Sequence, residues 1–176
     1  MGTDKGQLKY HGVPHRDYLY DLVSDYCERT FLSIRKNQKD TIGVNRDFIV
    51  DKDCFKGPFN GILSASEAYP AVAWMVFACD LPFLDAPAIE LLYKKRNPDK
   101  VATVFATNKS GLPEPLCAIW EPKGLKAAKE WLNTSGTSCP RKFLINSEIE
   151  LVFPEDDSVL FNANFESDYK EALNRL

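Results

Sequence analysis

The sequence has few of the residues that build metal clusters or disulfide networks. Among its 176 residues there are two histidines, His11 and His15, and there is no HExxH motif and no grouping of Cys with His. The five cysteines are odd in number and form no CxxC pair. These shortages predict neither a structural zinc site nor a complete disulfide framework, and they favour a reducing cytoplasm.

The chain also lacks a long apolar run and an excess of charge of either sign. No stretch approaches the roughly 20 apolar residues of a membrane-spanning helix, and the first residues lack the apolar core of a signal peptide. The net charge is -3 and the basic residues are scattered along the chain. We therefore expect no nucleic-acid partner, no membrane partner and a cytoplasmic protein.

What is present is an ordinary globular composition, 44% hydrophobic and 27% charged, in which helical and extended patterns alternate. The length suits one domain, residues 1–176. Helices are predicted at 15–29, 62–69, 87–96, 124–132, 141–145 and 166–176, and strands at 31–34, 48–50, 74–78, 101–106, 116–120 and 149–153. This alternation predicts an α/β fold, a three-layer α/β/α, Rossmann-like arrangement around a mostly parallel sheet.

An aspartate follows the most apolar predicted strand, in the run Cys79-Asp80-Leu81-Pro82. Ligands of parallel sheets bind beyond the carboxyl ends of the strands, and Mg²⁺ is commonly held by one or two carboxylates plus substrate phosphates. Asp80 is therefore a candidate magnesium ligand. The alternative is that Asp80 caps the next helix, although Asp85 is the closer cap candidate.

A second candidate site lies between residues 51 and 61. Gly57 and Gly61 flank a turn in which the backbone can approach a ligand closely, and the following helix offers its N-terminus to an anion. Asp51, at the end of a short strand, is either a second site carboxylate or a solvated side chain. The competing interpretation of the two glycines is a plain turn.

Two polar segments near the ends of the chain are further candidates. Lys5 can neutralise a triphosphate as a compact charge, but composition alone favours a frayed, solvated tail. Asn162 and Asn164 precede the last predicted helix and either contact a polar ligand or cap that helix. The position of Asn164 favours the cap.

Taken in order, these runs resemble the MobA-like nucleotidyltransferases, the molybdenum cofactor guanylyltransferases. The matching runs are Met1-Gly2-Thr3-Asp4-Lys5 with the second half of a LAGGxSxRMGxDK-type loop, Gly57-Pro58-Phe59-Asn60-Gly61 with a GPxxG turn, Ala78-Cys79-Asp80-Leu81-Pro82-Phe83 with a CDMP-type metal motif, Glu114-Pro115-Leu116-Cys117-Ala118 with EPLxA, Arg141-Lys142-Phe143-Leu144 with RxFL, and Asn162-Ala163-Asn164 with NxNTPED. The resemblance spans nearly the whole chain, and six motifs in the same order are more specific than any one of them.

The resemblance implies transfer of GMP from GTP to molybdopterin, with Mg²⁺ as the cofactor and pyrophosphate as the second product. At the matching positions, Lys5 binds the triphosphate, Asp80 binds Mg²⁺, and both are catalytic, while Asp51 is a further nucleotide-site or catalytic acid. The residues implied on the pterin side are Gly57, Gly61, Arg141, Asn162 and Asn164. Transient contact with other molybdenum cofactor proteins is also implied. The alternatives are a CTP- or sugar-phosphate-type nucleotidyltransferase and a non-catalytic homologue.

The match to the glycine-rich loop begins in the middle of that motif. The first strand and the glycine pair of the family have no counterpart in the sequence, so we expect them upstream of Met1. Without that strand, the sheet would have an unpaired gap in its core.

Overall fold

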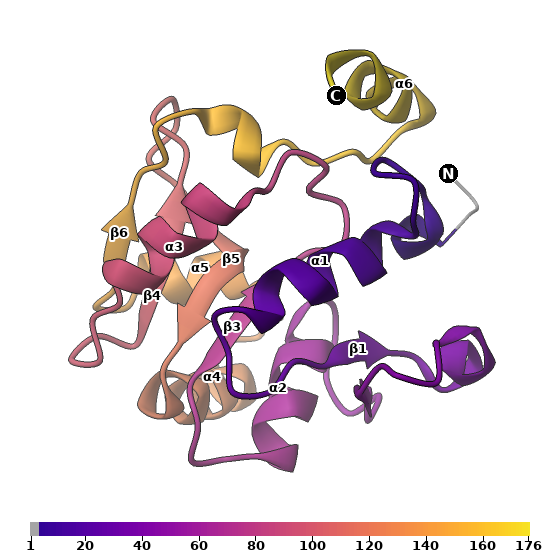
Figure 1. Ribbon diagram of the computed structural model, residues 1–176. Coiled ribbons are helices and arrows are strands. Elements are labelled where there is room, and N and C mark those ends of the chain that lie inside the picture. The colour runs from indigo at the N-terminus through magenta and orange to yellow at the C-terminus, as the bar shows by residue number, and fades with distance from the viewer. Residues whose placement is uncertain (1–3) are drawn as a thin grey trace.

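The strands form two sheets in the computed structural model, which describes residues 4–176 (Figure 1). In the smaller sheet, β1 (Leu32–Ile34) and β2 (Phe48–Val50) pair in parallel. The larger sheet has the order β3-β5-β4-β6, and its strands are β3 (Trp74–Phe77), β4 (Ala102–Ala106), β5 (Pro113–Trp120) and β6 (Glu150–Val152). Strand β5 runs antiparallel to both neighbours, whereas β3, β4 and β6 share one direction. The mostly parallel sheet that the sequence predicts is confirmed, with one reversed strand in its interior.

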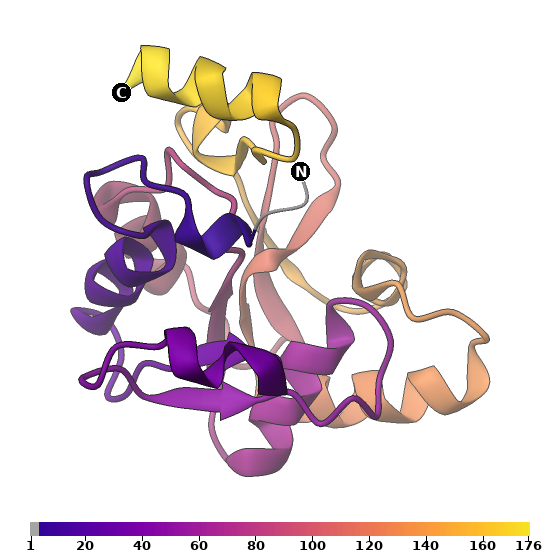
Figure 2. The same ribbon diagram turned by 90° about the vertical axis from the view of Figure 1, so that its right-hand side faces the viewer.

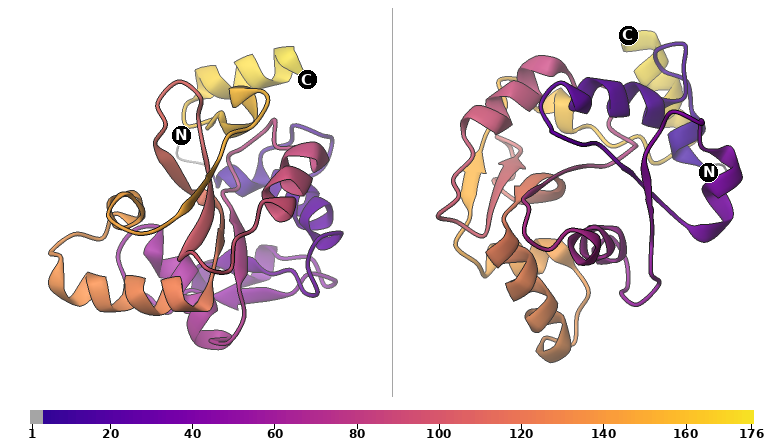
Figure 3. Two further views of the ribbon diagram at one scale, coloured as in Figure 1. Left: turned by 90° about the vertical axis from the view of Figure 1, so that its left-hand side faces the viewer. Right: turned by 60° about the horizontal axis from the view of Figure 1, so that its bottom comes forward.

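Helices cover both faces of the larger sheet, which gives the predicted three-layer arrangement (Figure 3). The helices are α1 (His15–Ser24), α2 (Phe59–Ala68), α3 (Ala86–Lys94), α4 (Pro122–Thr134), α5 (Pro140–Ile145) and α6 (Glu166–Arg175), with short 3₁₀ turns η1 (Lys5–Gln7), η2 (Lys36–Thr41) and η3 (Asp157–Leu160). On one face pack α1 and α3, and on the other α2, α4 and α5. Helix α6 lies beside the amino-terminal segment, so both ends of the described chain meet at one edge of the molecule (Figure 2).

The core follows from the alternation of side chains along the inner strands. In β5, Cys117 and Ile119 pack on the face of α1 and α3, whereas Ala118 and Trp120 pack on the face of α2 and α4. Successive strand residues point to opposite faces, so a strand covered on both sides must be apolar throughout. Strand β4 comes close to this condition, because all of its residues are buried and Thr103 alone among them is polar.

The apolar run 74–78 forms β3, whose side chains pack in the clusters on both faces of the sheet, as expected. Strand β3 is nevertheless the end strand of its sheet, and its four residues are only half-buried. Among the described residues, the edge of β3 away from β5 has no strand partner, and β3 lines a cavity. The helix predicted to reach Arg29 also ends earlier, at Ser24, whose hydroxyl donates to Thr30 Oγ1 where the chain turns back toward β1.

All five cysteines are free thiols, as their odd number and spacing predict. Within residues 4–176, no helix combines the length and the apolar character that crossing a bilayer requires.

Gly124 supplies a test of this packing. A Cβ atom at this position in α4 would lie 2.0 Å from the carbonyl oxygen of Val101, a backbone atom that cannot rotate away. We expect Gly124→Ala to lower the free energy of unfolding by about 3 kcal/mol or to prevent folding, because overpacking against backbone is costly. Urea unfolding measures the effect. Gly43→Ala is the control, since its Cβ would be 3.8 Å from the nearest side chain, and equal stability of both variants would contradict this packing.

Candidate functional site

Three side chains that are far apart in sequence meet at the carboxyl end of β3. Lys5 Nζ donates to Asp80 Oδ2 at 3.0 Å and to Asn164 Oδ1 at 2.5 Å. The side chains of Lys5 and Asp80 are 30% and 17% exposed, so the pair is reachable from solvent while being partly shielded from it. Among residues 4–176, nothing donates a hydrogen bond to Asp80 Oδ1, and this oxygen remains available to a ligand.

Backbone contacts hold the three segments in place. The carbonyl of Asp80 accepts from the Ala163 N–H at 2.9 Å, which ties the end of β3 to the segment before α6. The Asp4 carboxylate caps η1 by accepting from the Gly6 N–H at 3.0 Å. Asp168 accepts from the N–H groups of Asn164 and Phe165, which fixes the turn that carries Asn164. The arrangement is therefore built by the fold and does not depend on one ion pair.

These contacts correct two interpretations drawn from composition. Lys5 lies in a 3₁₀ turn beside the buried Gly6 and pairs with Asp80, so it is not part of a frayed tail. The Asn164 side chain accepts from Lys5 and does not cap α6. The cap assigned to Asp85 is confirmed, because its carboxylate accepts from the Ala88 N–H at 2.9 Å. Asp80 is therefore not needed as a helix cap. Met1, Gly2 and Thr3 of the loop motif lie outside the described residues.

Two histidines hold the loop that follows Asp80. His11 Nε2 and His15 Nε2 donate to the carbonyl oxygens of Pro82 and Leu81, at 3.1 and 3.0 Å. His15 is fully buried, and its Nδ1 has no partner within the described chain. Because Nε2 must carry the proton to donate to a carbonyl, a second proton on Nδ1 would place an unpaired charge in the interior. Burial accordingly lowers the pKa of His15 to about 4.

The second candidate group surrounds Asp51, at the end of β2. Asp51 accepts from Ser33 Oγ at 2.7 Å and from Asn60 Nδ2 at 3.3 Å. Burial raises the pKa of Asp51, and these two hydrogen bonds only partly offset that effect. A Cβ at Gly61 would lie 2.6 Å from Ser33 Oγ, so glycine gives this hydrogen bond its space. Gly57 has a φ of +62°, as the predicted turn requires.

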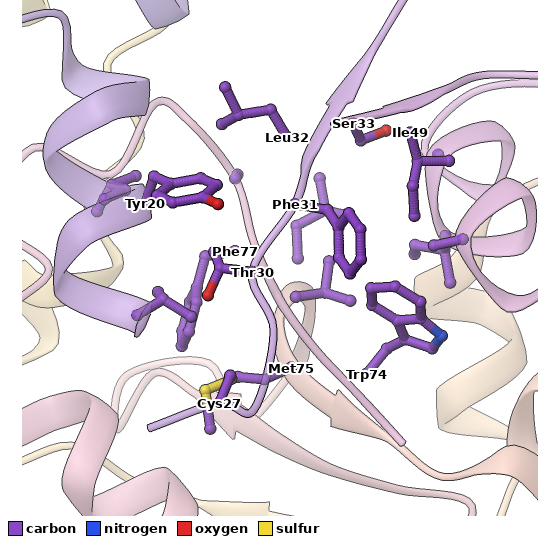
Figure 4. A pocket seen from close by; sticks show the side chains of 18 of the residues that line it. Tyr20, Cys27, Thr30, Phe31, Leu32, Ser33, Ile49, Trp74, Met75 and Phe77 are labelled. Atoms are coloured by element: carbon purple, nitrogen blue, oxygen red, sulfur yellow. The ribbon is translucent and has the colours of Figure 1, made fainter. Parts of the chain in front are cut away.

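One cavity of about 770 Å³ is lined by Asp51 of the second group and by Gly6 and Cys79, the sequence neighbours of Lys5 and Asp80. This inter-sheet cavity lies between β1 and β3, with residues of α1 and α2 in its walls. Figure 4 shows side chains of both strands around it, among them Leu32, Trp74 and Phe77. Its polar lining includes Asp51 and Asp4, while Cys79 and Gly6 are the sequence neighbours of Asp80 and Lys5.

Arg141 and Asn162 do not line the inter-sheet cavity. Arg141 donates to the Pro113 carbonyl at 2.9 Å and to Glu114 at 2.6 Å, so the RxFL and EPLxA runs are in contact with each other. Asn162 is half-buried and donates to the Leu160 carbonyl at 3.1 Å. The structure thus joins Lys5, Asp80 and Asn164 and leaves Arg141 on a separate patch.

The donor set at Asp80 fits a magnesium ion that is shared with a substrate. No group of three or more His, Cys, Asp or Glu side chains within residues 4–176 is arranged to hold a metal alone. Mg²⁺ commonly uses one or two carboxylates and takes its other oxygen ligands from phosphates and water. A single carboxylate with one free oxygen, beside a lysine, has the chemistry of such a site.

A network that joins η1 to η2 is not evident from the sequence. Asp4 accepts from Gln38 Nε2 at 2.7 Å, and the buried Arg16 donates to Thr41 Oγ1 at 3.2 Å. The one available signal was helical spacing, because Arg16 lies three residues before Leu19 and seven before Val23, both of which are buried on the same helix.

Comparison with known proteins identifies the family of this chain. Residues 1–149 match the MobA-like NTP transferase domain. The chain belongs to this family. Within it, the chain is 37% identical over 170 residues to a molybdenum cofactor biosynthesis bifunctional protein of Synechocystis sp., covering 96% of the chain and 49% of that protein. The chain thus spans about half the length of this relative.

Other relatives and solved structures agree on the domain. A molybdenum cofactor guanylyltransferase of Pseudomonas fluorescens is 29% identical, with 93% of the chain and 82% of that protein covered. The molybdopterin-guanine dinucleotide biosynthesis protein A of Archaeoglobus fulgidus superposes with a TM-score of 0.80 at 20% identity, covering 99% of the chain and 91% of that structure. A 2-C-methyl-D-erythritol 4-phosphate cytidylyltransferase of Thermus thermophilus reaches 0.72 at 14% identity, with coverages of 99% and 94%. The two structures confirm the fold of the MobA-like domain.

The buried histidine predicts how the stability of the MobA-like domain depends on pH. The folded pKa of His15, about 4, lies below its ordinary value of 6.5, so between these values the unfolded chain binds a proton that the folded chain excludes. Stability is therefore complete above about pH 6.5 and falls by up to about 3 kcal/mol as the pH approaches 4. Urea unfolding at intervals across this range measures it. His15→Gln keeps a donor for Leu81 and should flatten this part of the profile, whereas parallel profiles would contradict the assignment.

Proposed function

We propose that the MobA-like domain transfers GMP from GTP to molybdopterin in a Mg²⁺-dependent reaction that releases pyrophosphate. The observation that carries this proposal is the contact of Lys5 with Asp80 and Asn164 at the carboxyl end of β3. The relatives from Synechocystis and P. fluorescens, named for molybdenum cofactor biosynthesis and guanylyl transfer, support the choice of substrates. A cytoplasmic reaction is part of this proposal, and the free thiols support it.

The proposed reaction needs no nucleophile from the protein. An oxygen of the molybdopterin phosphate attacks the α-phosphorus of GTP and forms a new P–O bond. The bond from the α-phosphorus to the bridging oxygen breaks, and this oxygen leaves with the bonding electrons as part of pyrophosphate. Such transfers depend mainly on positioning and on neutralising negative charge.

In our proposal, three side chains of the domain position the substrates and neutralise their charge. Asp80 is the residue that would hold Mg²⁺, which neutralises charge on the phosphates when bound. Lys5, which now pairs with Asp80 and Asn164, provides three N–H donors and a compact positive charge for phosphate oxygens. Asp51 is partly buried with a raised pKa, which suits a proposed role as a nucleotide-site or catalytic acid.

We assign the pterin side to the residues that the family resemblance indicates. Gly57 and Gly61 line the inter-sheet cavity, and Asn164 accepts a hydrogen bond from Lys5, which supports their assignment. Asn162 immediately precedes Ala163, whose N–H donates to the Asp80 carbonyl. Arg141 and Glu114 form an ion pair, and in our proposal Arg141 exchanges that partner for an anionic group of the pterin. Other proteins of molybdenum cofactor assembly are proposed as transient partners.

Replacing Asp80 tests the metal assignment. Asp80→Ala should lower Mg²⁺-dependent GMP transfer by roughly a thousandfold, because it removes the protein ligand of the ion. The fold should persist, since the side chain bonds only to a partly exposed lysine in the described structure. The assay follows label from the α-phosphate of GTP into the dinucleotide product.

Asp85→Ala is the matched control for this experiment. It removes the α3 cap and should cost about 1 kcal/mol of stability while leaving the metal dependence of transfer unchanged. A fully active Asp80→Ala protein would refute the role of Asp80.

Replacing Lys5 separates nucleotide binding from the fold. Lys5→Ala should weaken GTP binding by about tenfold to a hundredfold, the usual loss for a hydrogen bond to a charged group. Calorimetric titration in the presence of Mg²⁺ measures the affinity. Lys9→Ala is the control, because Lys9 is exposed and close in sequence. Equal affinity of both variants for GTP would remove Lys5 from the site.

A further inference from the structure

Arg16, the second residue of α1, is the one lysine or arginine among residues 4–176 that is buried. A charged side chain is costly to bury unless nearby groups pair with it. The pairing is incomplete, because the Asp4 carboxylate lies 3.8 Å from Nη1 and Nε has no partner within the described chain. An apolar side chain would fill the same space at a lower desolvation cost. Space filling alone therefore does not account for an arginine at this position.

The contacts of Arg16 with η1 lie on both sides of Lys5. On one side, the guanidinium faces Asp4. On the other side, the Gln7 amide, with its oxygen turned toward the guanidinium, accepts from Nη2 at 2.7 Å and from Nη1 at 3.1 Å. The aliphatic stem lies against Gly6, where an added Cβ atom would be 3.3 Å from both Cβ and Cδ of Arg16. The turn that carries Lys5 is thus packed and hydrogen-bonded against this one side chain.

The same guanidinium binds the segment that follows β1. Its Nη1 donates to Thr41 Oγ1 at 3.2 Å, and its Nη2 donates to the Thr41 carbonyl oxygen at the end of η2. Asp4 makes a parallel connection by accepting from Gln38 Nε2 at 2.7 Å. A guanidinium presents five N–H donors in one plane, so it can bind two segments at once in a fixed geometry. Arg16 therefore fixes η1 relative to both α1 and η2.

Lys5 depends on this support because η1 is too short to keep its own place. The turn has only three residues, and isolated helical turns of that length are unstable. From this turn, Lys5 Nζ reaches Asp80 Oδ2 at 3.0 Å and Asn164 Oδ1 at 2.5 Å. A hydrogen bond is lost when donor and acceptor separate beyond about 3.5 Å, so a shift of η1 by about 1 Å would misplace the ammonium group.

We propose that Arg16 is a positioning residue of the nucleotide site, which acts through Lys5 and does not itself contact the nucleotide. The guanidinium holds η1 so that the Lys5 ammonium group is pre-organised for the triphosphate of GTP. Pre-organisation of this kind lowers the cost of ordering a group on binding. The inference rests on the proposed transfer of GMP.

A double-mutant cycle tests whether Arg16 acts through Lys5. Arg16→Met keeps most of the stem and removes the guanidinium, and it should weaken GTP binding in the presence of Mg²⁺ by roughly tenfold in calorimetric titration. In a Lys5→Ala protein the same substitution should have no further effect, since residues that act through one contact are not additive. An equal loss in both backgrounds would overturn the proposal, because Arg16 would then contact the nucleotide directly or support the whole fold.

Arg16→Lys separates positioning from charge. Lysine keeps the positive charge but has no planar fork, so it cannot bind η1 and Thr41 together. We expect Arg16→Lys to weaken GTP binding by nearly as much as Arg16→Met, and full affinity would overturn the proposal in favour of simple charge attraction. Arg46→Met is the matched control, because Arg46 binds α1 through Asp21 and, within the described chain, makes no hydrogen bond or ion pair with η1. Its affinity for GTP should equal that of the unsubstituted chain.

Hydrogen exchange in the nucleotide-free protein tests the same role without any ligand. The Leu8 N–H closes η1 by donating to the Lys5 carbonyl at 3.2 Å. In Arg16→Met, the Leu8 amide should exchange roughly fivefold faster, while the Val23 amide near the other end of α1 keeps its rate. Unchanged exchange at Leu8, or equal acceleration at Val23, would contradict a local positioning role.

Gly6→Ala provides a second route if Arg16→Met does not fold. The new methyl group meets the Arg16 stem at 3.3 Å, so η1 must move away by a few tenths of an ångström while the guanidinium stays present. GTP binding should weaken roughly threefold, and this loss should disappear in the Lys5→Ala background. No loss, or the same loss in both backgrounds, would refute the proposal.

The Lys5→Ala protein distinguishes failure of this inference from failure of the proposed function. If Lys5→Ala leaves the affinity for GTP unchanged, both the role of Lys5 and the role of Arg16 are wrong. If Lys5→Ala weakens GTP binding and Arg16→Met does not, the positioning role of Arg16 alone is refuted.

Discussion

The ammonium group of Lys5 joins three segments that are separated by more than 70 residues: the amino-terminal turn, the end of β3 and the segment before α6. As a partly exposed ion pair, Lys5 with Asp80 contributes at most about 1 kcal/mol to stability. Its importance is geometric, because a carboxylate with one free oxygen and a positive charge are held side by side where the sheet ends. Three kinds of contact hold these groups in place: the surrounding backbone hydrogen bonds, the cap of η1, and the hydrogen bonds from His11 and His15 to the carbonyls of Pro82 and Leu81.

The fold supplies this site through ordinary rules of α/β architecture. Strands β4 and β5 are mostly apolar and form the interior of the sheet, and the less buried β3 lies at its end, beside the inter-sheet cavity. Asp51, which follows β2, lines this cavity, and so does Cys79, the neighbour of Asp80. The candidate residues from the two sheets thus lie at or next to one cavity.

Much of this could be predicted from the sequence, since the helices and strands follow from periodicity, and Asp85 from its cap position. The order of motifs also indicated Asp80 and Lys5. From composition, Lys5 was assigned to a frayed tail and Asn164 to a helix cap, and both assignments were wrong. An isolated polar residue near a chain end is typical of a tail or a cap, and its hydrogen-bond partners can be known only from the fold. The buried Arg16 and the half-buried β3 were missed, since burial depends on neighbours distant in sequence. Arg141 remains apart from the cavity, and its role stays a prediction.

The central claim is that the domain binds GTP with Mg²⁺ through Lys5 and Asp80. A thermal-shift panel of GTP, CTP, ATP and UTP, each with and without Mg²⁺, tests it most directly. A ligand that binds only the folded state raises Tm, and the rise grows with the logarithm of its concentration relative to its Kd. The account predicts stabilisation by GTP that is selective, requires Mg²⁺ and is lost in Asp80→Ala. Selective stabilisation by CTP, or an equal shift with all four nucleotides that persists without Mg²⁺ and in Asp80→Ala, would contradict it.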